Sequence, residues 1–375
     1  MTKACVWDEL VGQRKVADHL AAAVRRGAIS HAYLFVGPAG TGKKSAARAL
    51  ACAILCNGDA CGACEICRRV KRGAHPDVRT VQPEGAANYV IEQIRDIIHD
   101  VNLSPVEASR KIFILDAADT FNEASANAFL KTLEEPPDDV VIILLATTYD
   151  GVLPTISSRC QMIRFKRMAP EAAAALLAES TGAGEDETFA ALAATGGVLM
   201  RAREFLDSPM RRAARDHMLS LLKDLSVFDE HDVLQSAKML LTAVKAPLDE
   251  LKTLQAEEAR TRAEFLGSKG MKTLEERQKR QLTAREREGV AEVLNVTESW
   301  LRDCLVLSQG APELLVNRDE TDAMQAIAAV ITPAAATRAL GAVKEARKRI
   351  SYNVSPQLAV EAMLFDIREV LQCPR

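Results

Sequence analysis

At 375 residues the chain is long enough for two or three domains, and its 48% of hydrophobic residues allow each of them a core. A formal net charge of −3 excludes a protein that binds DNA through its overall charge, although a local basic face stays open. The sequence has no apolar run of about 18 residues and begins without a signal-peptide pattern, so we expect a cytoplasmic protein without a membrane span.

Alternating strands and helices are predicted in the first part of the chain. Short apolar runs predict buried strands, and stretches with helical spacing separate them. The expected strands are 32–36, 77–81, 112–116, 140–147 and 162–165, and the expected helices include 42–54 and 123–135. This alternation indicates a parallel sheet with helices on both faces.

The strand pattern ends after residue 165. An Ala- and Leu-rich segment of about 169–208 predicts a small helical domain, and Pro209 opens a third region that is helical to the end. Within that region, residues 248–290 carry dense alternating charge. They predict a solvated helical hairpin that is broken at 267–270.

A glycine-rich loop follows the first predicted strand and opens a helix. It reads Gly37-Pro38-Ala39-Gly40-Thr41-Gly42-Lys43. In such a loop the backbone N–H groups wrap a phosphate, the helix N-terminus adds positive potential, and the lysine reaches the outer phosphates. The loop therefore predicts a site for ATP or ADP, with a glycine-rich turn kept for packing as the alternative.

Two substitutions affect the chemistry expected of such a site. Lys44 stands where a Ser or Thr ligand of Mg²⁺ is required, and Ser45 is rotated about 100° away on the helix. The strand at 112–116 ends in Asp116, which either holds Mg²⁺ through water or is an ordinary exposed carboxylate. Its neighbour is Ala117 where a water-orienting Glu is common, so we predict no ATP hydrolysis unless Asp119 replaces that acid.

Four of the nine cysteines lie within twelve residues and predict a metal site. They are Cys56, Cys61, Cys64 and Cys67. Four thiolates bind Zn²⁺ tetrahedrally, and a set without an open position is structural. An iron–sulfur cluster, which also uses four cysteines, is the alternative, whereas a redox pair needs only one CxxC. Because four thiolates fill the site, His75 is expected to be a turn residue.

Further motifs accompany the loop and the cysteines. They include His75-Pro76-Asp77, Leu130-Lys131-Thr132-Leu133-Glu134-Glu135-Pro136-Pro137 and Ser158-Arg159-Cys160. With these motifs, residues 1–208 resemble the clamp-loader subunits of the AAA+ superfamily, whereas the last third is similar only in being helical. The resemblance implies an α/β AAA+ domain of the RecA-like type over 1–166 with a zinc module at 56–67, a helical lid domain over 167–208 and an all-α collar domain over 209–375.

The resemblance also assigns roles to single residues. In that family the arginine of the Ser-Arg-Cys motif acts in trans, so Arg159, beside Ser158, would reach the γ-phosphate of ATP held by a neighbouring subunit. A helix-capping or salt-bridged arginine is the alternative. Thr147 or Thr148 matches one sensor position of the nucleotide site, and Arg201 matches the second.

Family members differ in this chemistry. The gamma or tau type keeps the Ser or Thr and the Glu, whereas the delta-prime type lacks some of them, so Lys44 and Ala117 favour delta-prime. The resemblance implies an accessory subunit of bacterial DNA polymerase III that helps load the sliding clamp on primed DNA, in a hetero-oligomeric ring with gamma/tau and delta types. A hydrolysing gamma-type ATPase and a nucleic-acid-binding zinc module are the alternatives, and the 4% of aromatic residues count against the second.

Overall fold

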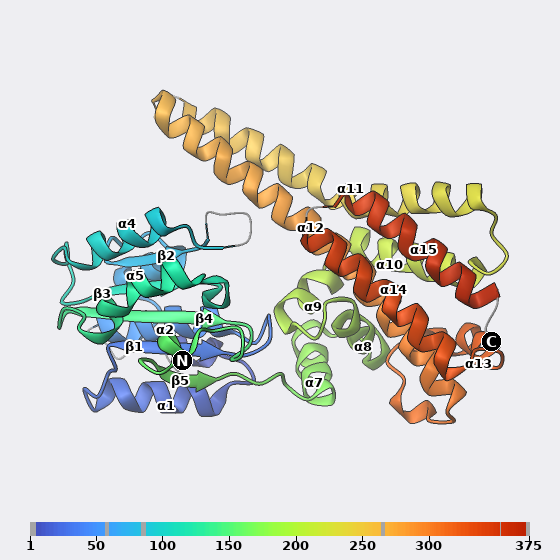
Figure 1. Ribbon diagram of the computed structural model, residues 1–375, viewed down its shortest axis with the longest axis horizontal. Helices are drawn as coiled ribbons and strands as arrows, with labels where there is room; N and C mark the ends of the chain where they lie inside the picture. Colours follow the sequence, from blue (N-terminus) through green and yellow to red (C-terminus); the bar gives the residue numbers. More distant parts are fainter. Residues whose placement is uncertain (1–4, 57–59, 84–87, 264–266, 353, 373–375) are drawn as a thin grey trace. The chain divides into compact units, whose positions relative to one another are not determined.

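The computed structural model describes residues 5–56, 60–83, 88–263, 267–352 and 354–372 (Figure 1). The chain divides into two compact units, Met1–Met168 and Ala169–Arg375. The first unit holds the sheet, and the second consists of helices. The predicted collar and all but the first two residues of the predicted lid lie in the second unit, and their separation into two domains stays a prediction.

The sheet of the first unit has five parallel strands in the order β2-β3-β4-β1-β5. The strands are β1 (Ala32–Val36), β2 (Val78–Val81), β3 (Lys111–Leu115), β4 (Val140–Ala146) and β5 (Gln161–Arg164). Each lies within one residue of its predicted bounds, because short apolar runs between helical segments mark buried parallel strands. β3 and β4 are buried along their whole length.

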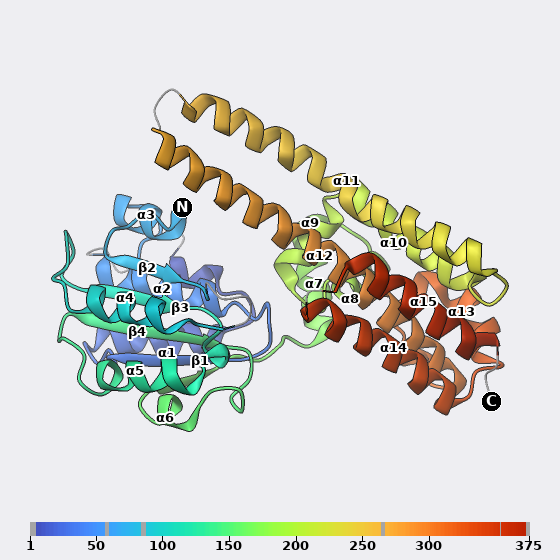
Figure 2. The same cartoon turned by 45° about the horizontal axis from the view of Figure 1, so that its top comes forward.

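Helices cover both faces of this sheet (Figures 1 and 2). They are α1 (Arg14–Arg25), α2 (Lys43–Leu55), α3 (Glu65–Arg72), α4 (Ile91–Val101), α5 (Glu123–Glu134) and the short α6 (Pro154–Ser157). Successive strand residues face opposite sides, so Phe35 packs with residues of α1, α2 and α3, and Leu34 with residues of α4 and α5. The prediction of helices on both faces is confirmed.

The second unit is helical throughout the residues that the structure describes. Its α-helices are α7 (Pro170–Thr181), α8 (Glu185–Ala194), α9 (Leu199–Leu206), α10 (Pro209–Asp224), α11 (Glu230–Ala263), α12 (Ser268–Ser308), α13 (Thr321–Ala328), α14 (Pro333–Ser351) and α15 (Pro356–Gln372). The prediction of a helical C-terminal region is confirmed. None of the helices in the described ranges has the length and apolar composition that crossing a membrane requires.

The predicted hairpin is formed by α11 and α12, which run side by side (Figures 1 and 2). Gly289 of α12 faces Val244 of α11 so closely that a Cβ atom there would lie 2.7 Å from the Val244 Cγ1. The break was predicted at 267–270; α12 begins at Ser268, and residues 264–266 lie outside the described residues. Gly267 is the N-cap of α12, where glycine is accepted, so the helix includes Gly270.

Candidate functional site

The glycine-rich loop connects β1 to α2, and three of its glycines have separate structural reasons. Gly40 and Gly42 adopt φ values of +76° and +84°, the left-handed region that favours glycine. A Cβ atom on Gly37 would lie 2.4 Å from the carbonyl oxygen of Phe165, so packing explains this position. The packing alternative therefore accounts for Gly37, and the turn geometry accounts for the other two.

The loop and the first turn of α2 present donors that fit the phosphates of a nucleotide. The first N–H groups of a helix have no acceptor within the helix, and their dipoles favour an anion. The hydroxyl of Thr41 donates to the Pro38 carbonyl at 2.9 Å and holds the loop. Lys43 Nζ donates to the carbonyl oxygens of Gly37 and Pro38, so its ammonium lies over the loop. Burial lowers the pKa of Lys43, and the charge of Asp116 opposes this shift.

The side chain that replaces the metal ligand is paired with the strand-end carboxylate. Lys44 Nζ lies 3.2 Å from Asp116 Oδ2. The same oxygen accepts from Gln82 Nε2 at 3.5 Å, and Oδ1 accepts the Ala117 N–H at 3.1 Å. The two positions that hold Mg²⁺ in a hydrolysing phosphate-loop protein are therefore joined here by an ion pair. No local sequence pattern predicts this pairing; its signal in the sequence is the presence of opposite charges at the two metal positions.

The remaining predicted nucleotide residues of the first unit lie at the ends of β3 and β4. Asp119 Oδ2 accepts the Thr147 N–H at 3.1 Å, which holds this carboxylate at the end of β4. Ala117 has φ +52°, a left-handed conformation that is uncommon outside glycine. The Thr148 hydroxyl lies 2.9 Å from where a Cβ of Gly151 would be, so this glycine leaves room for the hydroxyl. The sensor role of either threonine stays a prediction.

The four clustered cysteines converge where α2 ends and α3 begins. Their Sγ atoms all lie within 4.8 Å of one another, with Cys56 at 3.7 Å from Cys61 and 3.6 Å from Cys64. A tetrahedral site with Zn–S bonds of about 2.3 Å has S···S edges of about 3.8 Å. The described donor set therefore fits a closed tetrahedral metal site. Residues 57–59 of the predicted module lie outside the described residues.

Backbone groups prepare two of these sulfurs for metal binding. The Cys64 N–H donates to Cys61 Sγ and the Cys67 N–H donates to Cys64 Sγ, each at 3.4 Å. Bonds from the N–H groups of Ala63 and Cys64 lower the pKa of Cys61 to about 6, whereas burial raises the pKa of Cys67. The thiolate is the form that ligates a metal, so a bound cation would favour the charged form of all four.

The His-Pro-Asp motif has a structural task beside the cysteines. His75 Nδ1 accepts the Asp77 N–H at 3.2 Å, and its Nε2 lies 3.3 Å from a Glu107 carboxylate oxygen. Asp77 accepts three backbone N–H groups, from Val106, Glu107 and Ala108, at 2.6, 3.0 and 2.9 Å. Burial alone would raise the pKa of Asp77, but these three bonds lower it. Both side chains thus fix the turn before β2 and the segment before β3, in line with the expectation for His75.

Arg159 follows α6 and is paired within its own chain. Its Nε donates to Glu134 Oε1 at 2.7 Å, and its Nη2 contacts the same oxygen. Its Nη1 donates to the Thr155 carbonyl at 2.9 Å and to the Ser158 hydroxyl at 3.3 Å. The salt-bridged alternative thus describes Arg159 in the single chain, and its role in trans stays a prediction. Glu134 belongs to the motif at 130–137, and no local sequence pattern predicts its pairing with Arg159.

Arg201, the predicted second sensor, lies on α9 of the second unit. Its Nη2 is 2.9 Å from Glu288 Oε1 of α12. The role of Arg201 as a nucleotide sensor stays a prediction.

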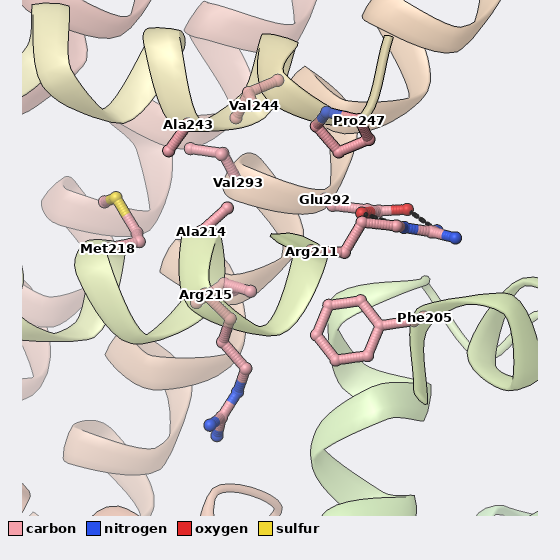
Figure 3. Close-up of a pocket in the computed structure, with 12 residues that line it drawn as sticks. Phe205, Arg211, Ala214, Arg215, Met218, Ala243, Val244, Pro247, Glu292 and Val293 are labelled. Atoms are coloured by element: carbon pink, nitrogen blue, oxygen red, sulfur yellow. Dashed lines mark hydrogen bonds and ion pairs between the residues drawn. The ribbon is translucent and has the colours of Figure 1, made fainter. Parts of the chain in front are cut away.

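A cavity in the second unit lies between α9, α10, α11 and α12 (Figure 3). Arg211 and Glu292 point toward each other at its edge, with Arg211 Nε 3.0 Å from Glu292 Oε2, and Phe205 lies beside the guanidinium. Burial raises the pKa of Glu292, and Arg211 opposes this shift. The cavity holds about 20 Å³, room for about one water molecule, so it is a packing gap and not a nucleotide site.

Comparison with known proteins assigns the chain to a family. A family model described as "DNA polymerase III, delta subunit" matches residues 12–169, and "DNA polymerase III, delta subunit, C terminal" matches residues 274–369. The chain belongs to the clamp-loader subunit family of DNA polymerase III. The first match spans the phosphate loop, the cysteine cluster and Arg159. The second match begins within α12 and ends within α15, so it includes α13 and α14.

Relatives with two different subunit names are similar to this clamp-loader chain. DNA polymerase III subunit delta' of Pseudomonas aeruginosa is 40% identical over 136 residues, which are 35% of this chain and 42% of that protein. DNA polymerase III subunit tau of Bacillus subtilis is 37% identical over 170 residues, which are 44% of this chain and 30% of that protein. The chain thus matches less than half the length of these relatives, and the similarity does not separate the two types.

One solved structure also matches over most of the length. A DNA polymerase III gamma subunit-related protein from Thermotoga maritima aligns with 93% of this chain and 98% of its own, at 18% identity and a TM-score of 0.44.

Proposed function

We propose that the chain is a delta-prime-type clamp-loader subunit, which helps ATP-dependent loading of the sliding clamp on primed DNA without hydrolysing ATP itself. The observation that carries this proposal is the ion pair between Lys44 and Asp116, next to Ala117. Phosphoryl transfer to water needs a metal on the phosphates and a group that orients the water. An ammonium stands at the metal position and a methyl group follows the strand-end Asp, so both requirements are unmet.

The proposed partners are the gamma/tau and delta types of subunit in a cytoplasmic hetero-oligomeric ring, together with the sliding clamp and with DNA through the assembly. Relatives named delta' and tau support this proposal, because both are subunits of DNA polymerase III. In the proposed subunit the four cysteines have a structural role, in which one zinc ion holds together the segment between α2 and α3.

We further propose that Arg159 acts on ATP bound by a neighbouring subunit. Its side chain is one-third exposed and its partner Glu134 is nearly half exposed. An ion pair with this exposure contributes about 0–1 kcal/mol, so a phosphate group competes with Glu134 easily. Phosphate also accepts the forked donors of a guanidinium in the same bidentate way as a carboxylate does. Ser158, which accepts from Nη1, orients the guanidinium.

The hydrolysing gamma type is the second candidate, favoured by the 37% identity to a tau protein and by the presence of Asp119 near Lys43. A single-turnover ATPase assay on the isolated chain distinguishes the two types. The delta-prime proposal predicts turnover at background, and robust hydrolysis by contaminant-free protein would contradict it. Co-purification with the gamma/tau and delta types then tests the assembly itself.

A further inference from the structure

The ion pair between Lys44 and Asp116 lies at the position of a metal ion. In hydrolysing phosphate-loop proteins, the side chain after the loop lysine and the strand-end Asp hold Mg²⁺ between them, and the ion contacts the β- and γ-phosphates. Here the same two positions, 72 residues apart in the sequence, carry a cation and an anion 3.2 Å apart. The positive charge at this point is thus supplied by the chain itself.

We propose that the Lys44 ammonium takes the place of Mg²⁺, so that the phosphate loop binds a nucleoside diphosphate or triphosphate in its metal-free form. This inference rests on the proposed non-hydrolysing nucleotide site and specifies the ligand that the site takes.

The surroundings of Asp116 disfavour a metal ion beside it. Mg²⁺ keeps an octahedral shell of oxygen acceptors, most of them water. Asp116 offers two carboxylate oxygens, and donors occupy both: the Ala117 N–H on Oδ1, and Lys44 and Gln82 on Oδ2. An ammonium has only donors and carries a positive charge, so it neither ligates Mg²⁺ nor tolerates it nearby.

The same surroundings suit the oxygens of a metal-free phosphate chain. The Lys44 ammonium has three donors, and the structure pairs it with one oxygen of Asp116, while about a third of the side chain is exposed. Lys43 lies over the loop carbonyls, and the first N–H groups of α2 add further donors. A diphosphate or triphosphate therefore meets two ammonium groups and a helix N-terminus. An ammonium neutralises a phosphate without polarising it as a divalent ion does, so binding does not lead to hydrolysis.

The test is the Mg²⁺ dependence of ADP binding to the full-length chain, measured by isothermal titration calorimetry. Metal-free buffer is prepared with chelating resin instead of EDTA, because EDTA would compete for the cysteine site. We expect the wild-type chain to bind ADP without Mg²⁺ and to bind it equally or more weakly when Mg²⁺ is in excess, since the ion must then be removed from the nucleotide. Lys44→Thr should show the opposite effect of Mg²⁺ on ADP affinity, with ADP binding at least about tenfold tighter when Mg²⁺ is present.

Two matched variants and one spectroscopic readout complete the test. Lys44→Arg keeps a cation opposite Asp116 and should behave like the wild type, whereas Lys43→Ala should lose ADP binding under both conditions. Electron paramagnetic resonance of Mn²⁺ with ADP should detect protein-bound Mn²⁺ for Lys44→Thr but not for the wild type.

Three outcomes would overturn the inference. They are ADP binding by the wild type that requires Mg²⁺, bound Mn²⁺ in the wild type, and no ADP binding under any condition. The last outcome, with hydrolysis still at background, leaves the proposed subunit function intact, so the two failures are distinguishable.

Discussion

At the scale of single residues, the proposed nucleotide site differs from a hydrolysing one by two side chains, Lys44 and Ala117. Lys44 is fixed by Asp116, and Ala117 already adopts φ +52°. Replacing Ala117 by another residue with a Cβ atom therefore adds no new backbone strain. The two defects are independent chemically, because one concerns the metal and the other concerns the attacking water.

Because the metal ligand and the water-orienting acid are both missing, restoring ATP hydrolysis should need both substitutions. The double variant Lys44→Thr with Ala117→Glu should gain ATP turnover that depends on Mg²⁺, whereas each single variant should stay at background. Single-turnover measurements with radiolabelled ATP check this expectation. Turnover by Lys44→Thr alone would show that Asp119 or another acid orients the water, and it would contradict the account of Ala117.

A second residue-scale prediction concerns Asp77 and its three backbone donors. Asp77→Asn should lower the free energy of unfolding at pH 7 by roughly 1–3 kcal/mol, because it removes the charge from a buried set of hydrogen bonds. Since the folded-state pKa is lowered, the stabilisation is present above the unfolded value of 3.8 and is lost as pH falls through the folded value. The difference between the two proteins in urea denaturation should therefore begin to shrink below about pH 5. A stability difference between the wild type and Asp77→Asn that grows as the pH falls would contradict the lowered pKa of Asp77.

At the scale of elements, the four cysteines lie between α2 and α3, and we expect a zinc ion to join the two helices there. Elemental analysis of anaerobically purified protein should give one zinc per chain, and stoichiometric iron would overturn the zinc assignment in favour of a cluster. Cys61→Ser should lose the metal, because a three-thiolate set no longer closes the tetrahedron. Cys304→Ser, which changes a buried thiol of α12 in the second unit, is the matched control and should keep it.

The elements and their contacts were not equally predictable from the sequence. Apolar runs placed all five strands, and the residue spacing placed the cysteines in one cluster, because both signals are local along the chain. The pairs Lys44–Asp116 and Arg159–Glu134 bring together residues 72 and 25 positions apart. They depend on how a helix end meets a strand end, which no local pattern contains. The predicted break at 267–270 extends too far, because α12 begins at Ser268 and accepts Gly270 in its first turn, while Gly267 is its N-cap.

At the scale of the whole molecule, the two compact units predict two cooperative unfolding steps. Only the first unit contains the cysteine module, so loss of the metal should destabilise that unit alone. Differential scanning calorimetry of the wild type and Cys61→Ser should show one transition at a lower temperature and the other unchanged. A single transition that moves as a whole would contradict independent unfolding of the units.

We propose that this chain acts on a nucleotide held by another subunit, and substitution of Arg159 separates this role from a purely structural one. The measurement compares clamp loading on primed DNA by reconstituted loaders that contain the wild type, Arg159→Ala or Glu134→Ala. Glu134→Ala is the matched control, because it breaks the same ion pair but leaves the guanidinium in place. Arg159→Lys should not restore clamp loading, since an ammonium lacks the forked donors of a guanidinium.

We predict that Arg159→Ala melts like the wild type yet abolishes most clamp loading, because an arginine finger contributes up to roughly 10³–10⁵ in rate at the site it faces. Glu134→Ala should load at the wild-type rate or faster, since it releases the guanidinium. Equal loading by Arg159→Ala and the wild type, or an equal loss in both variants, would reduce Arg159 to a structural partner of Glu134 and contradict the account.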